Sequence, residues 1–341
     1  MTLKSHRYLP LGFIALIFYA LALYQFSSPA VALPSQNASI CLYSNQADDD
    51  LRKTFTEAIL QAKKSITCII YSLSDAEIIQ ALKLQADRGI TTKVICDAVA
   101  TQGVQKKLGK NVQLFPVRQK GLMHNKLLSI DENVAWLGSC NFTRDSLLCH
   151  ANLVAGISSE SIAYAIEKKA LALQENKNSK IAPISVQLPD QHLDFHFLPD
   201  DKQVLSKVLK LLQSAKKSVK VAMFTFTHNE LIQQLIDLHR KGINVQIVLD
   251  NDSSRKTSKI ALNRFKAEKM DVRTSMRSGL LHEKIAIIDD EILIGGSTNW
   301  TKAAFTANDE HLFILYNVNS EQREKLATFW QTTLTESTSI Q

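Results

Sequence analysis

The 341-residue chain lacks the sequence motifs of the common metal-dependent and nucleotide-binding enzymes. It contains no His-Glu-x-x-His and no Cys-x-x-Cys pattern, and its acidic residues do not cluster as a two-metal site requires. A glycine-rich phosphate loop is also absent. These absences exclude the usual zinc, two-metal and phosphate-loop chemistries, and they predict an activity that needs no metal ion and no other cofactor.

Cysteines are few, and all of them lie in the first half of the chain. Because their number is odd, at least one thiol stays free, and the sequence leaves open whether one or two disulfides join the others. We interpret Cys140 as a packing residue rather than as a nucleophile. The five cysteines are Cys41, Cys68, Cys96, Cys140 and Cys149.

What the chain does contain is one pattern written twice. The first copy runs from His124 to Asp131 and the second from His282 to Asp289, and each reads His-x-Lys, then four residues, then Asp. Each copy is followed at the same distance by a Gly-Ser-x-Asn turn. Upstream segments also match, since residues 62–66 correspond to residues 215–219. The agreement predicts two copies of one domain rather than a short-period solenoid.

Each copy alternates helical and strand patterns. Apolar residues recur at helical spacing in some segments, and the segments between them are rich in β-branched and aromatic residues. Gly89 and Gly242 stand where a glycine ends a helix. The pattern predicts an α/β fold with largely buried sheets, and it places the His-x-Lys motif on a strand. The predicted helices are 51–64, 75–87, 204–217 and 229–241, and the predicted strands are 66–71, 93–96, 219–226 and 245–249.

The paired histidines and lysines are the candidate site. Side chains two residues apart on a strand share a face, so His124 and Lys126 project the same way, as do His282 and Lys284. A lone histidine is more often a core residue than part of a site. Two histidines at matched positions, each with its lysine, indicate a site that binds one phosphate diester between the repeats.

The doubled motif and its turns resemble those of the phospholipase D superfamily, and the resemblance covers roughly residues 40 to 335. Within the superfamily the chain is similar to the compact members, of the bacterial endonuclease and mitochondrial cardiolipin hydrolase type. The resemblance implies two repeated domains with sheets flanked by helices, related by a pseudo-two-fold axis, with the active site at their seam. We expect the first domain at residues 33–180 and the second at 181–341, with residues 174–198 as the linker.

Two histidines in opposite protonation states can split hydrolysis of a phosphate diester into two easier steps. A neutral imidazole attacks phosphorus, and a protonated imidazole gives its proton to the departing oxygen. Water activated by the second histidine then hydrolyses the phosphohistidine. Family precedent favours His124 as the nucleophile and His282 as the acid and base.

The resemblance implies roles for the remaining polar residues. Lys126 and Lys284 would bind the non-bridging oxygens and stabilise charge on the pentacoordinate phosphorus. Asp131 and Asp289 would be structural or would orient a histidine. The Glu that often follows the family's turn is Glu310 in the second repeat, where we expect it to orient His282; the first repeat has Asn152 instead. Neutral donors to the same phosphate oxygens would be Ser139, Asn141, Ser297 and Asn299.

The N-terminal residues predict export. Lys4 and Arg7 precede an apolar run over residues 9–23, and an Ala-x-Ala sequence ends at Ala32. This order is typical of a secretory signal peptide cleaved after Ala32, with an uncleaved signal anchor over residues 1–32 as the alternative. The formal charge of +7 favours anionic partners, such as lipid headgroups on a membrane surface or nucleic acid. No obligate protein partner is evident.

The leading functional interpretation is a phospholipase D-type phosphodiesterase that acts on phospholipids. An endonuclease that cuts DNA or RNA by the same mechanism is the alternative, although the sequence shows no long basic groove or aromatic stacking series. A phosphatidyl transferase of the cardiolipin synthase kind would need only an alcohol in place of water. A non-catalytic anion-binding protein is disfavoured because both His-Lys pairs are complete.

Overall fold

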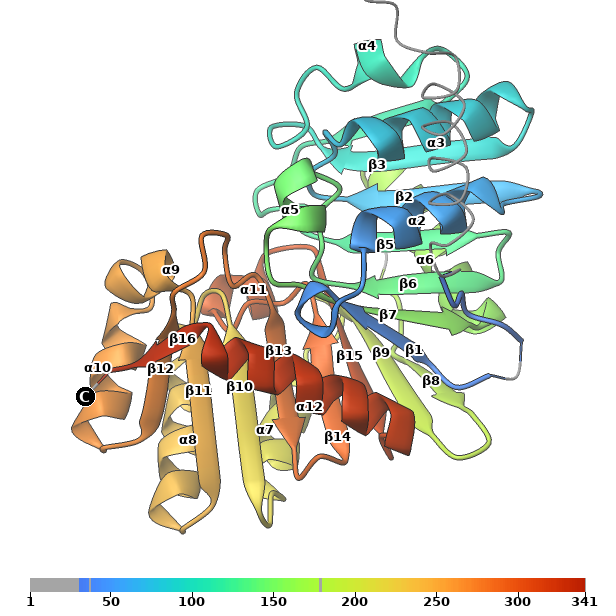
Figure 1. Ribbon diagram of the computed structural model, residues 1–341. Coiled ribbons are helices and arrows are strands. Elements are labelled where there is room, and N and C mark those ends of the chain that lie inside the picture. Colours follow the sequence, from blue (N-terminus) through green and yellow to red (C-terminus); the bar gives the residue numbers. More distant parts are fainter. Residues whose placement is uncertain (1–30, 37, 178–179, 341) are drawn as a thin grey trace, which may run out of the picture. The chain divides into compact units, whose positions relative to one another are not determined.

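The computed structural model describes residues 31–36, 38–177 and 180–340 (Figure 1). Residues Leu33–Gln341 form one compact unit. The predicted signal peptide or anchor falls almost wholly outside the described residues. Within the described ranges, no helix is long and apolar enough to cross a bilayer.

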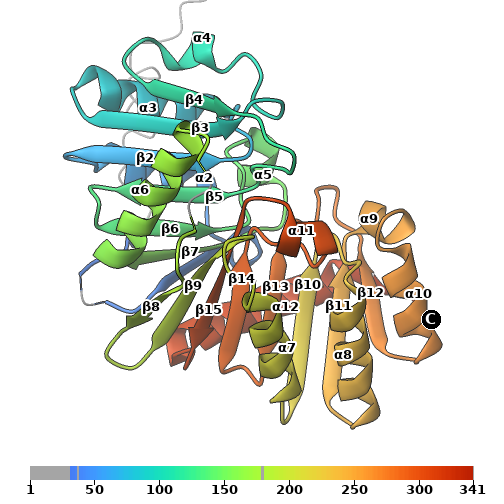
Figure 2. The same cartoon turned by 180° about the vertical axis from the view of Figure 1, so that it is seen from behind.

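The first repeat forms a sheet of seven strands in the order β1-β7-β6-β5-β2-β3-β4. Strands β2, β3 and β4 are parallel, and the other pairs are antiparallel. The strands are β1 (Cys41–Ser44), β2 (Ser65–Ile70), β3 (Thr91–Asp97), β4 (Gln113–Val117), β5 (Lys126–Ile130), β6 (Val134–Gly138) and β7 (Leu153–Ser158). Helices α2 (Leu51–Leu60) and α3 (Ala76–Asp87) cover one face, and α6 (Glu160–Gln174) covers the other (Figures 1 and 2). Short helices α4 (Gln105–Leu108) and α5 (Arg144–Leu148) lie in the connections.

The second repeat forms a sheet of nine strands in the order β16-β12-β11-β10-β13-β14-β15-β9-β8. Helices α7 (Val204–Gln213) and α8 (Asn229–Arg240) cover one face, and α12 (Ser320–Thr335) lies on the other (Figure 2). Its core strands are β10 (Ser218–Met223), β11 (Asn244–Leu249), β12 (Asp271–Ser275), β13 (Lys284–Ile288), β14 (Ile292–Gly296) and β15 (Glu310–Tyr316). The short helices in its connections are α9 (Asn251–Arg255), α10 (Lys259–Ala267) and α11 (Lys302–Thr306).

The segment predicted as a linker is partly structured, so that prediction was wrong. Strands β8 (Ile184–Gln187) and β9 (His192–Leu198) extend the second sheet, and β9 pairs with β15 along its full length. The strand β16 (Ser337–Ser339) closes the other edge against β12. Both strands carry the alternation of apolar and polar residues that predicts a strand, with Ile184 and Val186 in β8 and Leu193, Phe195 and Phe197 in β9. This signal was missed because the polar composition and the prolines of the segment were weighed instead.

One hydrophobic core joins the two repeats. It contains Ile69 and Leu127 of the first sheet together with Ile285 and Phe313 of the second. Along β13, Ile285 and Ile287 belong to this shared core, whereas Ala286 and Ile288 belong to a second core on the other face of the sheet. Both faces of the strand are therefore buried, which explains its continuous apolar run. The α/β fold predicted from the sequence, with helices flanking two sheets, is confirmed.

Candidate active site

The two His-Lys pairs lie at corresponding edges of the two sheets. Lys126 begins β5 and pairs with Ile70 at the end of β2, and Lys284 begins β13 and pairs with Met223 at the end of β10. Each histidine lies two residues before its lysine and reaches across to the other repeat. The backbone N–H of His124 donates to the carbonyl of Asp309 at 2.8 Å. That of His282 donates to the carbonyl of Ala151 at 2.9 Å.

The side chains of the two histidines are also held across the seam. Nδ1 of His124 lies 2.8 Å from Oε2 of Glu310, and Nδ1 of His282 lies 3.1 Å from Oδ1 of Asn152. In both contacts Nδ1–H is the donor, because a carboxylate or an amide oxygen can only accept. This tautomer leaves Nε2 of each ring with its lone pair or proton available for chemistry. Neither Nε2 has a hydrogen-bond partner among the described residues.

The predicted contact between Glu310 and His282 was therefore wrong. Glu310 begins β15 of the second repeat, and this end of the strand meets the motif of the first repeat, where Met123 and Asp309 form an isolated bridge. The equivalent bridge between Ala151 and Leu281 brings the first repeat to His282. Each repeat thus supplies the residue that orients the histidine of the other.

The serines of the two turns do not offer their hydroxyl hydrogens to a phosphate, contrary to expectation. Ser297 donates to Oε2 of Glu310 at 2.6 Å, and Ser139 donates to Oδ1 of Asn152 at 2.8 Å. A hydroxyl has one hydrogen to donate. Each serine therefore uses its hydrogen to fix the residue that accepts from a histidine, Asn152 or Glu310.

The side-chain amides of the two turn asparagines differ from the serine hydroxyls in having no acceptor within the part of the chain that the structure describes. Asn299 accepts from the backbone N–H of Thr225 through Oδ1, which orients its amide. The Nδ2 groups of Asn141 and Asn299 donate to no residue in the described ranges. Their role as neutral donors to phosphate oxygens stays a prediction.

The lysines are buried beside aromatic rings. Nζ of Lys126 lies 5.0 Å from the ring centroid of Tyr71, and Nζ of Lys284 lies 4.9 Å from that of Phe224. Each ammonium group also donates to the backbone carbonyl of the histidine in its own motif. Burial lowers the pKa of Lys284 to about 7, and it lowers the pKa of Lys126 well below its usual range. An anion bound between these lysines would restore their charge.

The two imidazoles differ in their electrostatic surroundings. Burial lowers the pKa of His124, while the carboxylate of Glu310 acts in the opposite direction. Burial also lowers the pKa of His282, and the charges of Lys284, Lys126 and His124 lower it further, so that it lies well below the ordinary value. In the absence of substrate His282 is therefore neutral, and the negative charge of a bound phosphate is what would favour its protonation.

The two aspartates of the motifs lie at the opposite ends of the strands from the histidines. Asp131 accepts from the backbone N–H groups of Lys63, Lys64 and Ser65 at distances of 2.6–3.0 Å. Asp289 makes the equivalent bonds to residues 216–218, each at 2.8 Å. Of the two roles left open for these residues, the geometry supports the structural one: they tie the end of the motif strand to the loop before β2 or β10.

Three polar residues of the site were missed by the sequence analysis. His311 is fully buried; its Nε2 accepts from the N–H of Gly138 at 3.1 Å, and its Nδ1 lies 3.2 Å from Oδ1 of Asn125. Asn308 donates to Oε1 of Glu310, and the ring of His150 lies 6.1 Å from that of His282. His150 and Asn308 occupy equivalent positions but are different residues, and His311 corresponds to Leu153, so matching of identical residues gave no signal for them. Tyr71 and Phe224 do correspond, and the repeat could have identified them.

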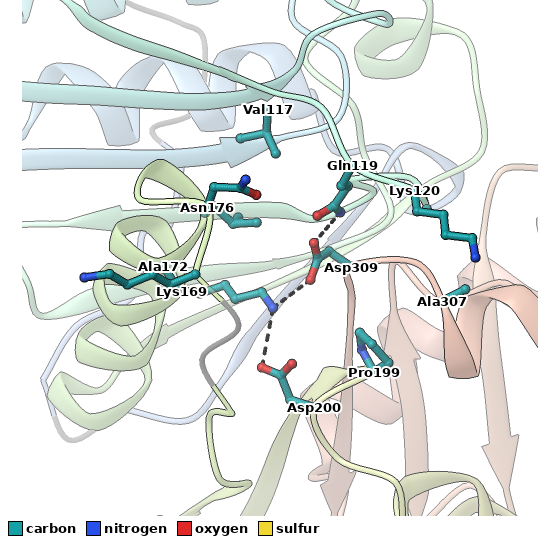
Figure 3. A pocket seen from close by; sticks show the side chains of 13 residues that line it. Val117, Gln119, Lys120, Lys169, Ala172, Asn176, Pro199, Asp200, Ala307 and Asp309 are labelled. Carbon is teal, nitrogen blue, oxygen red and sulfur yellow. Dashed lines mark hydrogen bonds and ion pairs between the residues drawn. The ribbon is translucent and has the colours of Figure 1, made fainter.

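Asp309 lines a cavity of about 250 Å³ (Figure 3). The carboxylate of Asp309 is held there by Lys169 at 2.7 Å and by the side-chain amide of Gln119. Lys169 also contacts Asp200 at 3.4 Å. This buried cluster fixes the residue whose carbonyl holds His124. Among the described residues, no three His, Cys, Asp or Glu side chains gather as a metal site would require.

The five cysteines are free thiols. Cys140 is buried, with its Sγ 3.5 Å from the carbonyl of Ser146, and burial raises the pKa of its thiol to about 12. A thiol with this pKa is a poor nucleophile near neutral pH, in agreement with a packing role.

A family model described as "Cardiolipin synthase, PLD-like domain" matches residues 55–173 and 208–331, which is more than half of the chain. The chain belongs to the phospholipase D superfamily. The match in two segments agrees with the duplication predicted from the sequence.

Several superfamily members resemble the chain. It is 34% identical over 125 residues to the mitochondrial cardiolipin hydrolase of Chlamydomonas reinhardtii, a match that covers 37% of this chain and 54% of the relative. It is 21% identical over 292 residues to a cardiolipin synthase of Staphylococcus aureus, covering 73% of this chain and 58% of the synthase. The chain therefore spans about half the length of the relatives it matches.

The fold is shared with a solved structure. The phosphatidylserine synthase of Haemophilus influenzae superposes with a TM-score of 0.68 over 90% of this chain and 89% of that one, at 14% identity. At this identity the likeness shows the fold alone, and it extends over both repeats.

Proposed function

We propose that the protein is a phosphodiesterase of the phospholipase D type that hydrolyses phospholipids through a covalent phosphohistidine, without a metal ion. The observation that carries this proposal is the unequal support of the two imidazoles. Nδ1–H of His124 donates to a carboxylate, whereas Nδ1–H of His282 donates to a neutral amide. The two rings are thereby suited to different tasks on the same phosphate.

In the first step Nε2 of His124 attacks phosphorus and the bond to the leaving oxygen breaks. The attacking ring becomes a cation as the P–N bond forms, and Glu310, which accepts from its Nδ1–H, stabilises that charge. The leaving oxygen takes the proton from Nε2 of His282. Because the partner of His282 is a neutral amide, its imidazolium releases this proton readily.

In the second step the neutral His282 accepts a proton from water as the water oxygen attacks phosphorus. The P–N bond breaks, and its electron pair returns to His124. Lys126 and Lys284 bind the non-bridging oxygens in both steps, with the amide groups of Asn141 and Asn299 as neutral donors. The two ammonium groups thus supply the charge that a metal ion supplies in other phosphodiesterases.

The names of the superfamily relatives support a phospholipid as the substrate of this protein. The names of the Chlamydomonas and Staphylococcus relatives concern cardiolipin, as a hydrolase and as a synthase. The same active site would serve a phosphatidyl transferase if an alcohol entered in place of water in the second step. The export signal predicted in residues 1–32 accords with a lipid substrate, and we propose that the enzyme acts outside the cytosol or on a membrane surface.

The substrate class is tested by incubating the purified protein, with a chelator present, with phosphatidylcholine, cardiolipin or single-stranded DNA. We expect release of phosphatidic acid from a phospholipid, and no such release by His124→Asn. Addition of a primary alcohol to the same assay distinguishes hydrolysis from transfer, since a transferase forms the phosphatidyl alcohol. Cleavage of DNA alone would show that the lipid assignment is wrong and that the endonuclease alternative is right.

A further inference from the structure

Exposed aliphatic side chains gather on the edge of the molecule that carries the histidines. The described part of the chain exposes eight large hydrophobic side chains, and five of them lie in the loops and short helices at this edge. The three most exposed are Val99, Met276 and Ile260, at 63%, 61% and 70%. Leu122 and Leu148 are the other two, whereas Leu60, Tyr164 and Leu171 lie elsewhere on the surface.

The sheet topology explains why these five residues share one edge. Val99 follows β3, Leu122 lies between β4 and β5, and Met276 follows β12, all at the strand ends next to the His-Lys pairs. Leu148 ends α5, which connects β6 to β7 at the same edge. Ile260 lies in the first turn of α10, on the way back from the end of β11.

Hydrogen bonds across the seam bring the loops of the two repeats together. The guanidinium of Arg277, next to Met276, donates to the carbonyl of Cys149, next to Leu148. The backbone N–H of Leu122 donates to Oδ1 of Asn308. Leu122, Leu148 and Met276 therefore lie in segments that meet the other repeat at the edge carrying the histidines.

Positive charge accompanies the aliphatic side chains. The loops that carry Leu122 and Ile260 expose five basic residues against one exposed acid, Asp252. In the loop of Leu148, Arg144 and Asp145 balance each other. The exposed basic residues are Arg118, Lys120, Arg255, Lys256 and Lys259.

We propose that this edge docks on a membrane surface that contains anionic lipid, an inference that rests on the lipid substrate proposed above. Aliphatic side chains flanked by basic ones suit the boundary between acyl chains and anionic headgroups. Single-stranded nucleic acid would instead require exposed aromatic rings for stacking, and the five side chains are all aliphatic. His124 and His282 are only 7% and 6% exposed, so a headgroup diester reaches them only if this edge lies against the bilayer.

Vesicle flotation tests the docking edge without requiring turnover. The protein carrying His124→Asn is mixed with phosphatidylcholine vesicles, with and without phosphatidylglycerol. We expect it to float with the anionic vesicles and to lose binding as salt is raised. Adding Val99→Gln, Ile260→Gln and Met276→Gln should weaken this binding at least about tenfold, because three exposed aliphatic anchors are lost. The matched control carries Leu60→Gln, Tyr164→Gln and Leu171→Gln, and we expect its binding to be unchanged.

Equal binding of vesicles by the two triple variants would overturn the inference that this edge docks on a membrane. Binding of the wild-type protein to DNA but not to vesicles would overturn it as well. The same substitutions in the active enzyme separate this outcome from failure of the proposed function. Hydrolysis of soluble bis(p-nitrophenyl) phosphate should be unchanged by the edge substitutions, while hydrolysis of vesicle lipid falls. If the enzyme binds vesicles through this edge but cleaves no phospholipid, the docking inference stands and the lipid-hydrolase proposal fails.

Discussion

His124 and His282 occupy equivalent positions in the two repeats, but the residues that accept from their Nδ1–H groups differ in charge. Glu310 accepts hydrogen bonds from three side chains, those of His124, Ser297 and Asn308. Asn152 also accepts from a histidine and a serine, but its Nδ2 donates to the carbonyl of Ser146. A carboxylate at position 152 would face that carbonyl oxygen, so the surroundings at each position select the residue found there. Duplication has kept the geometry of the site while its two halves have acquired different charges.

The largest expected effect comes from removing either imidazole. His124→Asn and His282→Asn should each reduce phospholipid hydrolysis by at least about 10³-fold, since one removes the nucleophile and the other the acid. Bis(p-nitrophenyl) phosphate separates the two variants, because its leaving group needs no proton. His282→Asn should form the covalent adduct with this substrate and release one equivalent of p-nitrophenol, whereas His124→Asn should release none. Equal p-nitrophenol bursts would show that the roles are not divided in this way.

Removing the negative charge of Glu310, which accepts from His124, should have the next largest effect on activity. Glu310→Gln keeps an acceptor for Nδ1–H but loses the negative charge, and we expect kcat to fall about 10²-fold. Asn152→Ala removes a neutral acceptor, and we expect a fall of about tenfold. Steady-state kinetics on a soluble diester measure both.

Glu283→Gln is the matched control for Glu310→Gln. Glu283 is a buried carboxyl next to His282, and burial raises its pKa to about 8, so it is already mostly neutral at pH 7. Its replacement should leave kcat within about twofold. A loss equal to that of Glu310→Gln would mean that general disruption of the buried site, rather than the charge behind His124, causes the effect.

Substrate binding should depend on pH through the lysines. A lysine whose pKa is lowered carries its charge only below that pKa, so Lys284 loses its charge as the pH rises through about 7. The KM for an anionic diester should therefore increase above neutral pH. Lys284→Arg keeps its charge throughout this range, and its KM should depend less on pH. Identical pH profiles for the two proteins would exclude Lys284 as the titrating group.

The smallest effect on activity is expected from the two aspartates, at which the repeats are alike. Asp131→Asn and Asp289→Asn each weaken charge-assisted hydrogen bonds to three backbone N–H groups, and we expect a loss of about 1–2 kcal/mol in the free energy of unfolding. Denaturant unfolding should show similar losses in both variants, with kcat unchanged. A large fall in kcat without a loss of stability would instead assign these aspartates a part in the reaction.

The sequence predicted the features that the two repeats share. The helices and strands of the predicted ranges are present, and Gly89 and Gly242 have the positive φ of 90° and 83° expected after a helix. The two His-Lys pairs lie at corresponding strand ends, as the matched motifs indicate.

Features that belong to one repeat, or that cross the seam, could not be predicted in the same way. Glu310 was identified as a site residue but was assigned to the wrong histidine, because sequence offsets do not show which strand ends meet. His311 corresponds to Leu153 in the first repeat, so a comparison of the two repeats did not identify it as a site residue. The serines of the two turns do match each other, but only the structure shows that their hydroxyl hydrogens are used on Asn152 and Glu310.

The division of roles is tested most directly by locating the covalent adduct. His282→Asn is mixed with bis(p-nitrophenyl) phosphate, quenched within its first turnover and digested under conditions that preserve phosphohistidine, and the peptides are analysed by mass spectrometry. We predict an aryl phosphate on the peptide that contains His124. An unmodified His124, or an adduct on another residue, would contradict the proposal that the imidazole supported by Glu310 attacks phosphorus.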